Sequence, residues 1–365
     1  MTLPGVNINF QTGQLGRVDD PGAGDAAMVV LMASSPAGHA FGDVKSYSRY
    51  EDLPEELQTI EGVRLFFTEA PGRTCWIMPV VDTTSITDVV DYQHATPYMS
   101  QLIDASDDIR FAGVVNDSLA VLDLATAGVN AAALRAYFIT KYRYVRVFLP
   151  VVYDETLPDL GESTYQGVGF IVSPLGDEVG LFLGRRARIQ VQRNVGRVKD
   201  GALAVSYAEL VGGTALEEDM PKVEEVFDKR YISLRTYVGK SGYYFTGDPL
   251  AVSAADDYAF DTDRAVIDKA AMIAYSTYIE EINNDVETDE DGTITTTGAK
   301  ELQGLIENAI DAAMTGNGEI SYVNAFVADT QNIVATNKVE VVLGIGKKGY
   351  LREISVKLGW EVNNG

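Results

Sequence analysis

The chain has 365 residues, of which 46% are hydrophobic, and its 29 basic and 53 acidic side chains give a net charge of −24 at pH 7. This length exceeds what one simple core needs, so we expect two domains, and so acidic a surface disfavours binding to nucleic acid or anionic membranes. One cysteine, Cys75, excludes a disulfide framework within the chain, and with only His39 and His94 besides it the composition argues against a metal site.

Residues 1–24 have the pattern of an arm. The opening MTLPGVNINF lacks a basic stretch followed by an apolar run, so we expect no signal peptide and synthesis in a cytoplasm, and no stretch is long and apolar enough to insert into a membrane. Val6, Ile8 and Phe10 alternate with asparagines, as in a short strand, and glycines follow. The segment is either a frayed terminus or a strand that pairs with the sheet edge of another chain.

From about residue 25 to residue 229, apolar runs alternate with helical patterns, which predicts an α/β domain with a mostly parallel or mixed sheet. The expected strands are residues 26–33, 74–81, 109–115, 144–152 and 167–172. Helices are expected at 98–105 and 131–142, with a turn and short helix at 47–57.

Residues 184–201 concentrate positive charge in this acidic chain, and Asp200 alone opposes it. Three of the arginines, Arg185, Arg186 and Arg188, open the segment. The segment could be a solvated strand with alternating arginines, or it could contact an acidic patch on another copy of the chain. Nucleic-acid binding is a poorer interpretation, because aromatic residues for stacking are absent and the net charge opposes it.

The last third, from about residue 231, is organised as strand, helix, acidic loop, helix and closing strands. Helices are expected at 263–284, capped by Asp261 to Asp263, and at 299–315, which glycines then stop. The final strands are expected at 339–345 and 351–362, paired around a turn at 346–349. The last strand carries alternating apolar residues, namely Ile354, Val356, Leu358 and Trp360.

The second of these helices has two different faces. Leu302, Leu305, Ile306, Ala309 and Ala313 form an apolar face that should pack on a sheet. Lys300, Glu307 and Asp311 lie in one row on the other face, which is either solvated or in contact with a partner.

Catalytic motifs are missing from the sequence. No G-x-S-x-G elbow occurs, and the glycines and lysines of 344–349 do not have the spacing of a phosphate-binding loop. The acidic loop from Glu287 to Gly292 starts like a calcium loop, but its twelfth position is Gly298 instead of glutamate. His94 has no nucleophile nearby in sequence. We therefore expect neither an enzyme nor a cofactor or metal.

Three stretches resemble contractile tail sheath proteins of phages, phage-tail-like bacteriocins and related injection systems. Residues 47–80 contain an aromatic-led turn, a paired Phe, a glycine turn and an apolar strand, and residues 231–250 contain a strand, a glycine turn and a strand. The order from 263 to the end is similar to the helix, loop, helix and strand order of the family's inner module. The chain departs from the family where Phe245 to Pro249 replace a Trp-Gly-Ala-Arg run, and where a single Gly72 replaces a glycine pair.

The resemblance implies a mixed α/β fold in two domains: an N-terminal arm (1–24), an outer α/β domain with a mixed sheet (25–229), and an inner module of a sheet and two helices (230–365) with extended terminal arms. It implies a structural subunit that polymerises into a helical sheath around an inner tail tube protein, contacts baseplate and terminator proteins, and contracts to drive the tube through a target envelope. The donated strands would be Val6 to Phe10 and the last strand, and Lys300, Glu307 and Asp311 would face the tube.

The resemblance also implies a location, first in the bacterial cytoplasm during assembly and then in the tail of a phage or tail-like particle. The alternatives are a baseplate or tail-terminator ring protein built on the same module, an α/β enzyme with an unrecognised site, and a plain binding module. Rings without long tubes would favour the ring protein. A deep polar pocket near His94 or the acidic loop would favour the enzyme, and a persistent monomer would favour the binding module.

Overall fold

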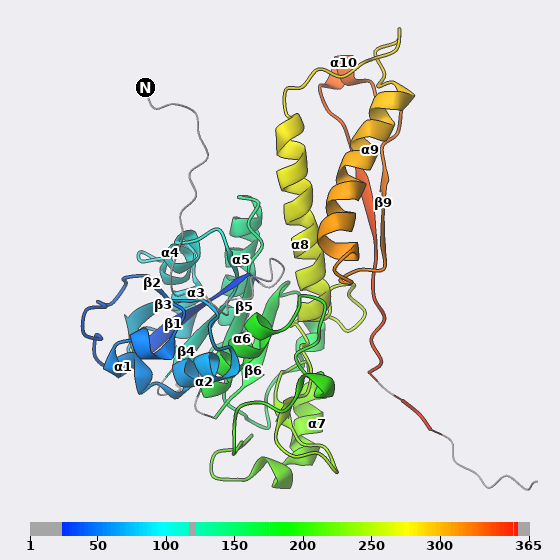
Figure 1. Cartoon of the computed structure of the whole chain (residues 1–365). Helices are drawn as coiled ribbons and strands as arrows, with labels where there is room; N and C mark the ends of the chain where they lie inside the picture. Colours follow the sequence, from blue (N-terminus) through cyan, green and yellow to red (C-terminus); the bar gives the residue numbers. More distant parts are fainter. Residues whose placement is uncertain (1–23, 117–121, 175, 353, 357–365) are drawn as a thin grey trace, which may run out of the picture. The chain divides into compact units, whose positions relative to one another are not determined.

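The computed structural model describes residues 24–116, 122–174, 176–352 and 354–356, and it divides the chain after Tyr275 into a large and a small compact unit (Figure 1). The N-terminal strand of Val6, Ile8 and Phe10 and the positions of Leu358 and Trp360 lie outside the described residues. Among the residues described, no helix is both long and apolar enough to cross a membrane.

The large unit is built on a six-stranded sheet with the order β2-β3-β1-β4-β5-β6. Its strands are β1 (Asp25–Met32), β2 (Lys45–Tyr47), β3 (Cys75–Val81), β4 (Ile109–Asn116), β5 (Arg146–Val151) and β6 (Val168–Val172). All neighbours pair in parallel except the short edge strand β2, which runs antiparallel to β3. The mixed α/β fold expected from the sequence is thus confirmed, and five of its strands lie where the apolar runs predicted them.

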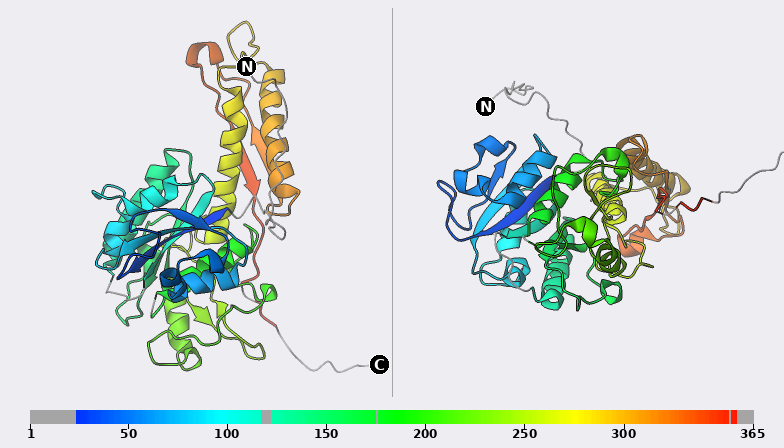
Figure 2. Two further views of the ribbon diagram at one scale, coloured as in Figure 1. Left: turned by 60° about the vertical axis from the view of Figure 1, so that its left-hand side comes forward. Right: turned by 90° about the horizontal axis from the view of Figure 1, so that it is seen from below.

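Helices cover both faces of this sheet, which is why its inner strands are continuous apolar runs (Figure 2). Within the large unit they are α1 (Glu55–Gln58), α2 (Glu61–Glu69), α3 (Ile86–Val90), α4 (Tyr98–Asp104), α5 (Leu124–Ile139), α6 (Asp177–Arg188) and α7 (Met220–Asp228). Helices α2 and α6 pack against each other on one face, and α3, α4 and α5 lie on the other. Gly180 allows the close crossing of α2 and α6, since a Cβ there would lie 1.9 Å from the carbonyl oxygen of Gly62.

The segment after α6 folds back on the same core. Strands β7 (Leu234–Arg235) and β8 (Tyr244–Phe245) pair antiparallel around the glycine turn that the sequence predicted. Ile232 extends the sheet beside β6, because its amide donates to Phe170 O at 2.9 Å and its carbonyl accepts from Val172 N at 2.8 Å. These contacts place residues 231–250 in the large unit, which extends to Tyr275. The start of an inner module near residue 230, expected from the resemblance, stays a prediction.

Helix α8 (Asp261–Tyr278) begins in the large unit and carries the chain across the division at Tyr275. It is followed by a single 3-10 turn at Ile279–Glu281, so it ends earlier than the expected residue 284. The helical backbone cannot continue to residue 284, because Ile282 is extended with ψ of 128° and Asn283 is left-handed with φ of +66°.

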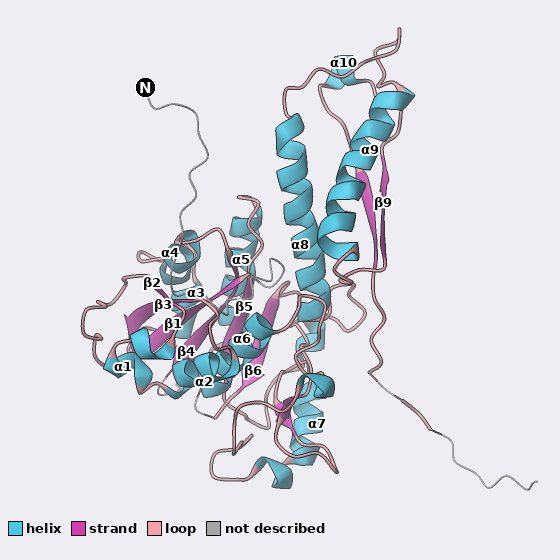
Figure 3. Cartoon of the chain, in the orientation of Figure 1, coloured by secondary structure: helices cyan, strands magenta, loops and turns pink. Residues whose placement is uncertain are grey.

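The small unit consists of α9 (Thr296–Ile310), which continues as a π-helical turn over Asp311–Thr315, a two-stranded antiparallel sheet and the short α10 (Ile333–Thr336) (Figure 3). The sheet pairs β9 (Tyr322–Phe326) with β10 (Val342–Gly346). The expected hairpin of 339–345 with 351–362 is therefore wrong for the described part: β10 pairs with β9, which the sequence analysis missed, and Ile354 and Val356 are not in a strand.

Most of the apolar face predicted for α9 lies at least partly buried. Ile306 and Ile310 are fully buried together with Met314 of the π-helical turn, and Leu302 packs against the buried Ile294. Leu305 is the exception, with 38% of its surface exposed. The side chains of β9 alternate in the same way. Ala325 is buried, whereas Tyr322 and Phe326 lie on the other face of the strand and are exposed.

Candidate functional site: the buried charge network at the root of helix α8

The first turn of α8 is buried and is held by Asp248, a residue outside the helix. The backbone amide of Asp261 donates to Asp248 O at 2.8 Å, and that of Thr262 donates to the Asp248 carboxylate at 3.0 Å. The Asp248 carboxylate also accepts from the amide of the Asn194 side chain. A carboxylate at this end of a helix satisfies free N–H groups and meets the positive end of the helix dipole. Asp248 thereby caps the helix from 13 residues upstream.

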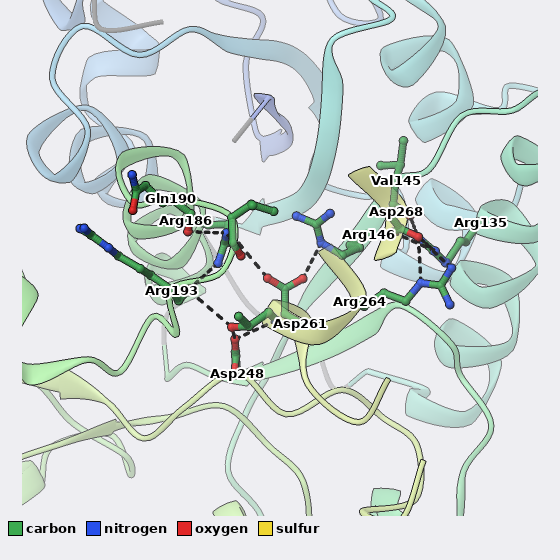
Figure 4. Close-up of polar contacts among 12 residues, drawn as sticks. Arg135, Val145, Arg146, Arg186, Gln190, Arg193, Asp248, Asp261, Arg264 and Asp268 are labelled. Atoms are coloured by element: carbon green, nitrogen blue, oxygen red, sulfur yellow. Dashed lines mark hydrogen bonds and ion pairs between the residues drawn. The ribbon is translucent and has the colours of Figure 1, made fainter. Parts of the chain in front are cut away.

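Two arginines of the large unit point toward the carboxylate of Asp261 (Figure 4). Arg146, on β5, forms an ion pair with one carboxylate oxygen of Asp261, and Nε of Arg186, on α6, lies 3.8 Å from the other. Arg186 also donates to three carbonyl oxygens of the following loop, those of Gln190 (3.0 Å), Val191 (2.7 Å) and Arg193 (2.8 Å). One carboxylate thus joins a strand, a helix and the start of α8.

Asp268, two turns further along α8, forms a second centre. Nη2 of Arg135, on α5, lies 2.8 and 2.9 Å from the two carboxylate oxygens, and Arg264 of the same helix donates to Oδ1 at 2.7 and 2.9 Å. Arg135 also donates to Val145 O at 2.7 Å, just before β5. The side chains of Arg135 and Asp268 are both 1% exposed. Hence α8 is fixed to α5 as well as to β5 and α6.

Burial and charge act differently on the two carboxyl groups that hold α8. Burial, and after it the neighbouring charge of Asp261, raises the pKa of Asp248 to about 6. Burial would also raise the pKa of Asp268, but Arg135 and Arg264 outweigh it and keep that pKa below its usual range. Asp268 therefore stays ionised through the neutral range, whereas Asp248 exchanges a proton near the acidic end of that range.

The predicted basic patch lies largely inside the large unit, which corrects the expectation of an exposed contact. Arg185 and Arg186 are 1% and 0% exposed, because α6 is a helix that packs on α2 instead of a solvated strand. Nε of Arg185 lies 2.6 Å from Glu69 of α2. Arg188 is half-exposed at its side chain, and its Nη1 lies 2.9 Å from the same carboxylate. Of these three arginines, only Arg188 reaches the surface, where it is available for a contact.

The row on α9 is not uniformly exposed either. Lys300 and Asp311 are exposed, but the Glu307 carboxylate accepts a hydrogen bond from the backbone amide of Ala325 on β9 at 2.6 Å. Contact of Lys300 and Asp311 with a tube stays a prediction, whereas Glu307 already has a partner in its own unit. Ile354 and Val356 are 72% and 70% exposed.

The large unit has a groove of about 630 Å³ between α2, the start of α6 and residues 203–209. Neither His94 nor the acidic loop, the two places where an active site would support the enzyme alternative, lines this groove. His94 lies elsewhere and stacks on Tyr98 with ring centroids 5.9 Å apart, and its Nδ1 lies 2.9 Å from Thr96 O. In the acidic loop, Asp291 accepts from the Thr293 amide at 3.1 Å, as in an ordinary turn. No cluster of three potential metal-ligating side chains occurs within the described parts of the chain.

Most of this network is not predictable from the sequence. The sequence predicts Asp261 as a capping residue and a surface role for Arg186, but it does not single out Arg135, Arg146 or Asp248. One signal was available: Arg146 stands at the start of an apolar strand run, where a charged side chain needs a buried partner. The partner itself is 115 residues away, and nothing in the local sequence identifies it.

Two family models together match nearly the whole chain. The model described as "DUF2586, N-terminal domain" matches residues 3–248, and the one described as "DUF2586, C-terminal domain" matches residues 257–365. No curated protein matches the sequence.

The fold is similar to solved structures of sheath proteins. A chain of the helical sheath of the anti-feeding prophage in its contracted state matches with a TM-score of 0.64 at 14% identity, covering 99% of this chain and 100% of that one. A chain of the baseplate of the same prophage matches with a TM-score of 0.60 at 14% identity and the same coverage. The sheath tail protein of Desulfitobacterium hafniense matches with a TM-score of 0.53 at 10% identity, covering 94% and 100%. The resemblance to contractile tail sheath proteins is thus confirmed at the level of the fold.

Proposed function

Since this chain belongs to the DUF2586 family and has the fold of sheath subunits, we propose that it is the structural subunit of a contractile tail sheath. Many copies would polymerise helically around an inner tail tube and contract to drive the tube through a target envelope. The observation that carries the proposal is the coverage of the match, because 99% of this chain aligns with all of a helical sheath chain and both units are therefore represented.

The buried charge network supports a mechanical role. A subunit that moves in a contracting array must keep its own fold while its contacts with neighbours change. Helix α8 is the covalent link between the two units, and Asp248, Asp261 and Asp268 attach its first two turns to three elements of the large unit. Ion pairs in a low-dielectric interior are short and directional, so they resist sliding of α8 along its axis.

The terminal arms would link the copies. In this proposal Val6 to Phe10 and the segment from Ile354 to Trp360 add strands to the sheets of neighbouring copies, which joins the helix into a mesh by main-chain hydrogen bonds. Contacts of this head-to-tail type do not close and generate an open helical array. The inner tail tube, the baseplate and the terminator would be the further partners, and the particle would assemble in a bacterial cytoplasm.

A second candidate is a ring protein of the baseplate or terminator. The similarity to a chain of the anti-feeding prophage baseplate, with a TM-score of 0.60, favours it. Negative-stain electron microscopy of the concentrated protein, alone and with the tube protein of its own gene cluster, separates the two. Tubes of variable length support the sheath, closed rings of constant size support the ring protein, and a monomer in both samples contradicts both.

A further inference from the structure

The two ends of the small unit carry opposite charges. The acidic loop, Glu287 to Gly292, holds four acidic residues, and all four are exposed. The basic turn, residues 347–352 after β10, contributes Lys347, Lys348 and Arg352, which line a surface recess of about 340 Å³. Figure 1 shows the acidic loop beside α10 at one end of α9, whereas the chain leaves β10 at the other end. In a protein with a net charge of −24, this group of cations is a local exception.

The acidic loop is fixed by its own hydrogen bonds. The side-chain amide of Asn332, before α10, donates to Asp291 O at 2.8 Å, and the amide and hydroxyl of Thr293 donate to the Asp291 carboxylate at 3.1 and 2.6 Å. Lys338, at the same end of the unit, pairs with Glu340 instead of the loop. Like charges are therefore held close together in a defined conformation, which costs free energy that an external cation would return.

The basic turn lies against the end of the π-helical turn that continues α9. A Cβ at Gly318 would lie 3.4 Å from Nζ of Lys348, so this ammonium group faces the negative end of the helix dipole. Lys347 and Arg352 are exposed, and the Arg352 guanidinium lies 5.9 Å from the ring centroid of Tyr350. The helix end accounts for Lys348, and the other two cations are presented at the surface of the unit.

The two charged ends cannot neutralise each other within one copy. Helix α9 has 15 residues and separates them by about 22 Å, since each helical residue adds about 1.5 Å. This distance is more than twice the Debye length of about 8 Å at physiological ionic strength, so each end is screened from the other. Copies with so large a net negative charge also repel one another unless patches of opposite sign meet.

We propose that the basic turn of one copy binds the acidic loop of a second copy, so that small units join end to end through charge-assisted hydrogen bonds. The inference rests on the proposed assembly of many copies and names one surface that joins them. Each copy offers both a turn and a loop, so the contact is heterologous and leaves one end of every pair available for a further copy. The polarity of the charges thereby sets the direction in which copies follow one another.

Thiol cross-linking of the concentrated full-length protein tests the contact and its direction. Thr288 lies exposed in the acidic loop, and nothing lies within 4 Å of a Cβ at Gly349 in the basic turn, so Thr288→Cys and Gly349→Cys keep every charge. Cys75 is buried and serves as the internal control. With a short bismaleimide, a mixture of the two variants should give the mixed dimer, identified by a mass tag on one copy. Each variant alone should give little, and a chain with both substitutions should give a ladder of multimers.

Charge reversal then isolates the electrostatic part of the contact. Lys347→Glu with Lys348→Glu, in the copy that contributes the turn, should reduce the mixed dimer about fivefold, as expected for the loss of a well-formed surface ion pair. Asp289→Lys with Glu290→Lys, in the copy that contributes the loop, should do the same. Mixing the reversed turn with the reversed loop should restore the mixed dimer, because the two patches again have opposite signs.

The matched control carries Lys199→Glu with Lys240→Glu, which changes the net charge as much as the reversed turn does but at exposed positions of the large unit, and it should cross-link like the wild type. The proposal is overturned by mixed dimers no more abundant than dimers of one variant with itself, by equal cross-linking after either reversal, or by a loss that the paired reversal does not restore. Sensitivity to the turn alone would assign it another acidic partner and overturn the proposal as well. Mixed dimers without tubes in electron micrographs would contradict the sheath and leave this contact standing.

Discussion

Arg135 of helix α5 binds Asp268 of helix α8 with Nη2 at 2.8 and 2.9 Å from the two carboxylate oxygens, across 133 residues of sequence and out of reach of solvent. Such a pair is not by itself a source of stability, because removing both charges from water costs about as much as their attraction returns. What the pair adds is position, since the guanidinium that contacts Asp268 through Nη2 is itself held by the Val145 carbonyl through Nη1, which fixes where α8 lies against α5 and β5.

Replacing one member of this pair should destabilise the large unit strongly, whereas replacing both members by apolar residues should not. We expect Asp268→Asn to lower the free energy of unfolding of the large unit by about 3–5 kcal/mol, because Arg135 would keep a buried charge without its partner. The double variant Arg135→Met with Asp268→Leu should lose much less, as Arg264 can turn towards solvent. Urea unfolding followed by circular dichroism measures both. Losses that simply add between Arg135→Met and Asp268→Leu would show that the two side chains are not coupled.

Asp248 should make stability depend on pH near neutrality. Its pKa is raised to about 6 by burial, so the folded protein takes up a proton on acidification before the unfolded chain does. Stability should therefore rise as the pH falls from about 8 to 5, by at most about 1.4 kcal/mol per pH unit for one proton. Glu178, with a pKa near 7, contributes in the same direction, and buried His39, whose pKa is lowered by burial, opposes both.

The variant Asp248→Asn separates this residue from the others. Its stability relative to the wild type should change by about 2 kcal/mol between pH 8 and pH 4.5, with the wild type gaining on acidification. Thermal melts of both proteins across this range provide the measurement, and Glu178→Gln serves as the control with its own, separate pH dependence. A difference between wild type and Asp248→Asn that stays constant over the range would contradict the raised pKa.

Gly180 should be irreplaceable at the crossing of α2 and α6. A Cβ at this position would lie 1.9 Å from Gly62 O, and the obstacle is backbone, which cannot turn aside as a side chain can. We expect Gly180→Ala to destabilise the large unit by about 1–3 kcal/mol, despite the better helix propensity of alanine. Gly304→Ala on α9 is the matched control, because nothing lies within 4 Å of a Cβ there, and it should be neutral or slightly stabilising.

Arg188 allows a test of what remains of the basic patch. Its side chain is 46% exposed, in contrast to that of Arg186, which is fully buried. Arg188→Glu should leave a folded protein, and it should weaken polymerisation if this face contacts an acidic patch of another copy. Sedimentation of the assembled protein at low and high salt measures the effect, since about 1 M salt reduces the Debye length to about 3 Å. Unchanged assembly at both salt concentrations would leave Arg188 with its contacts inside the unit, to Glu69 and to the carbonyl oxygen of Asp200.

The sequence specified some levels of this fold better than others. Strands β1, β3 and β4 were predictable because each is built on an apolar run, which Arg110 interrupts only near the start of β4, and buried parallel strands have that pattern. Strand β9, YVNAF, was missed, since it is short and carries an asparagine on its exposed face. The arginines of α6 were assigned to the surface because charge is normally solvated, and only the distant partners Glu69 and Asp261 make their burial possible.

The terminal arms give the most direct test of the proposed sheath. Deleting residues 1–12, or residues 355–365, should leave the cores of both units intact, because the residues of these cores lie between positions 26 and 327. Polymerisation should be lost in either truncation, since each removes a strand that the proposal assigns to a neighbouring copy. Circular dichroism reports the fold and electron microscopy reports the tubes. A matched full-length control carries Ile354→Asn and Val356→Asn, which keep the backbone donors but remove the apolar face, and it should polymerise more weakly than wild type without losing the fold. Normal tubes from both truncations would show that copies are joined by other surfaces, and the strand-linked mesh would have to be abandoned.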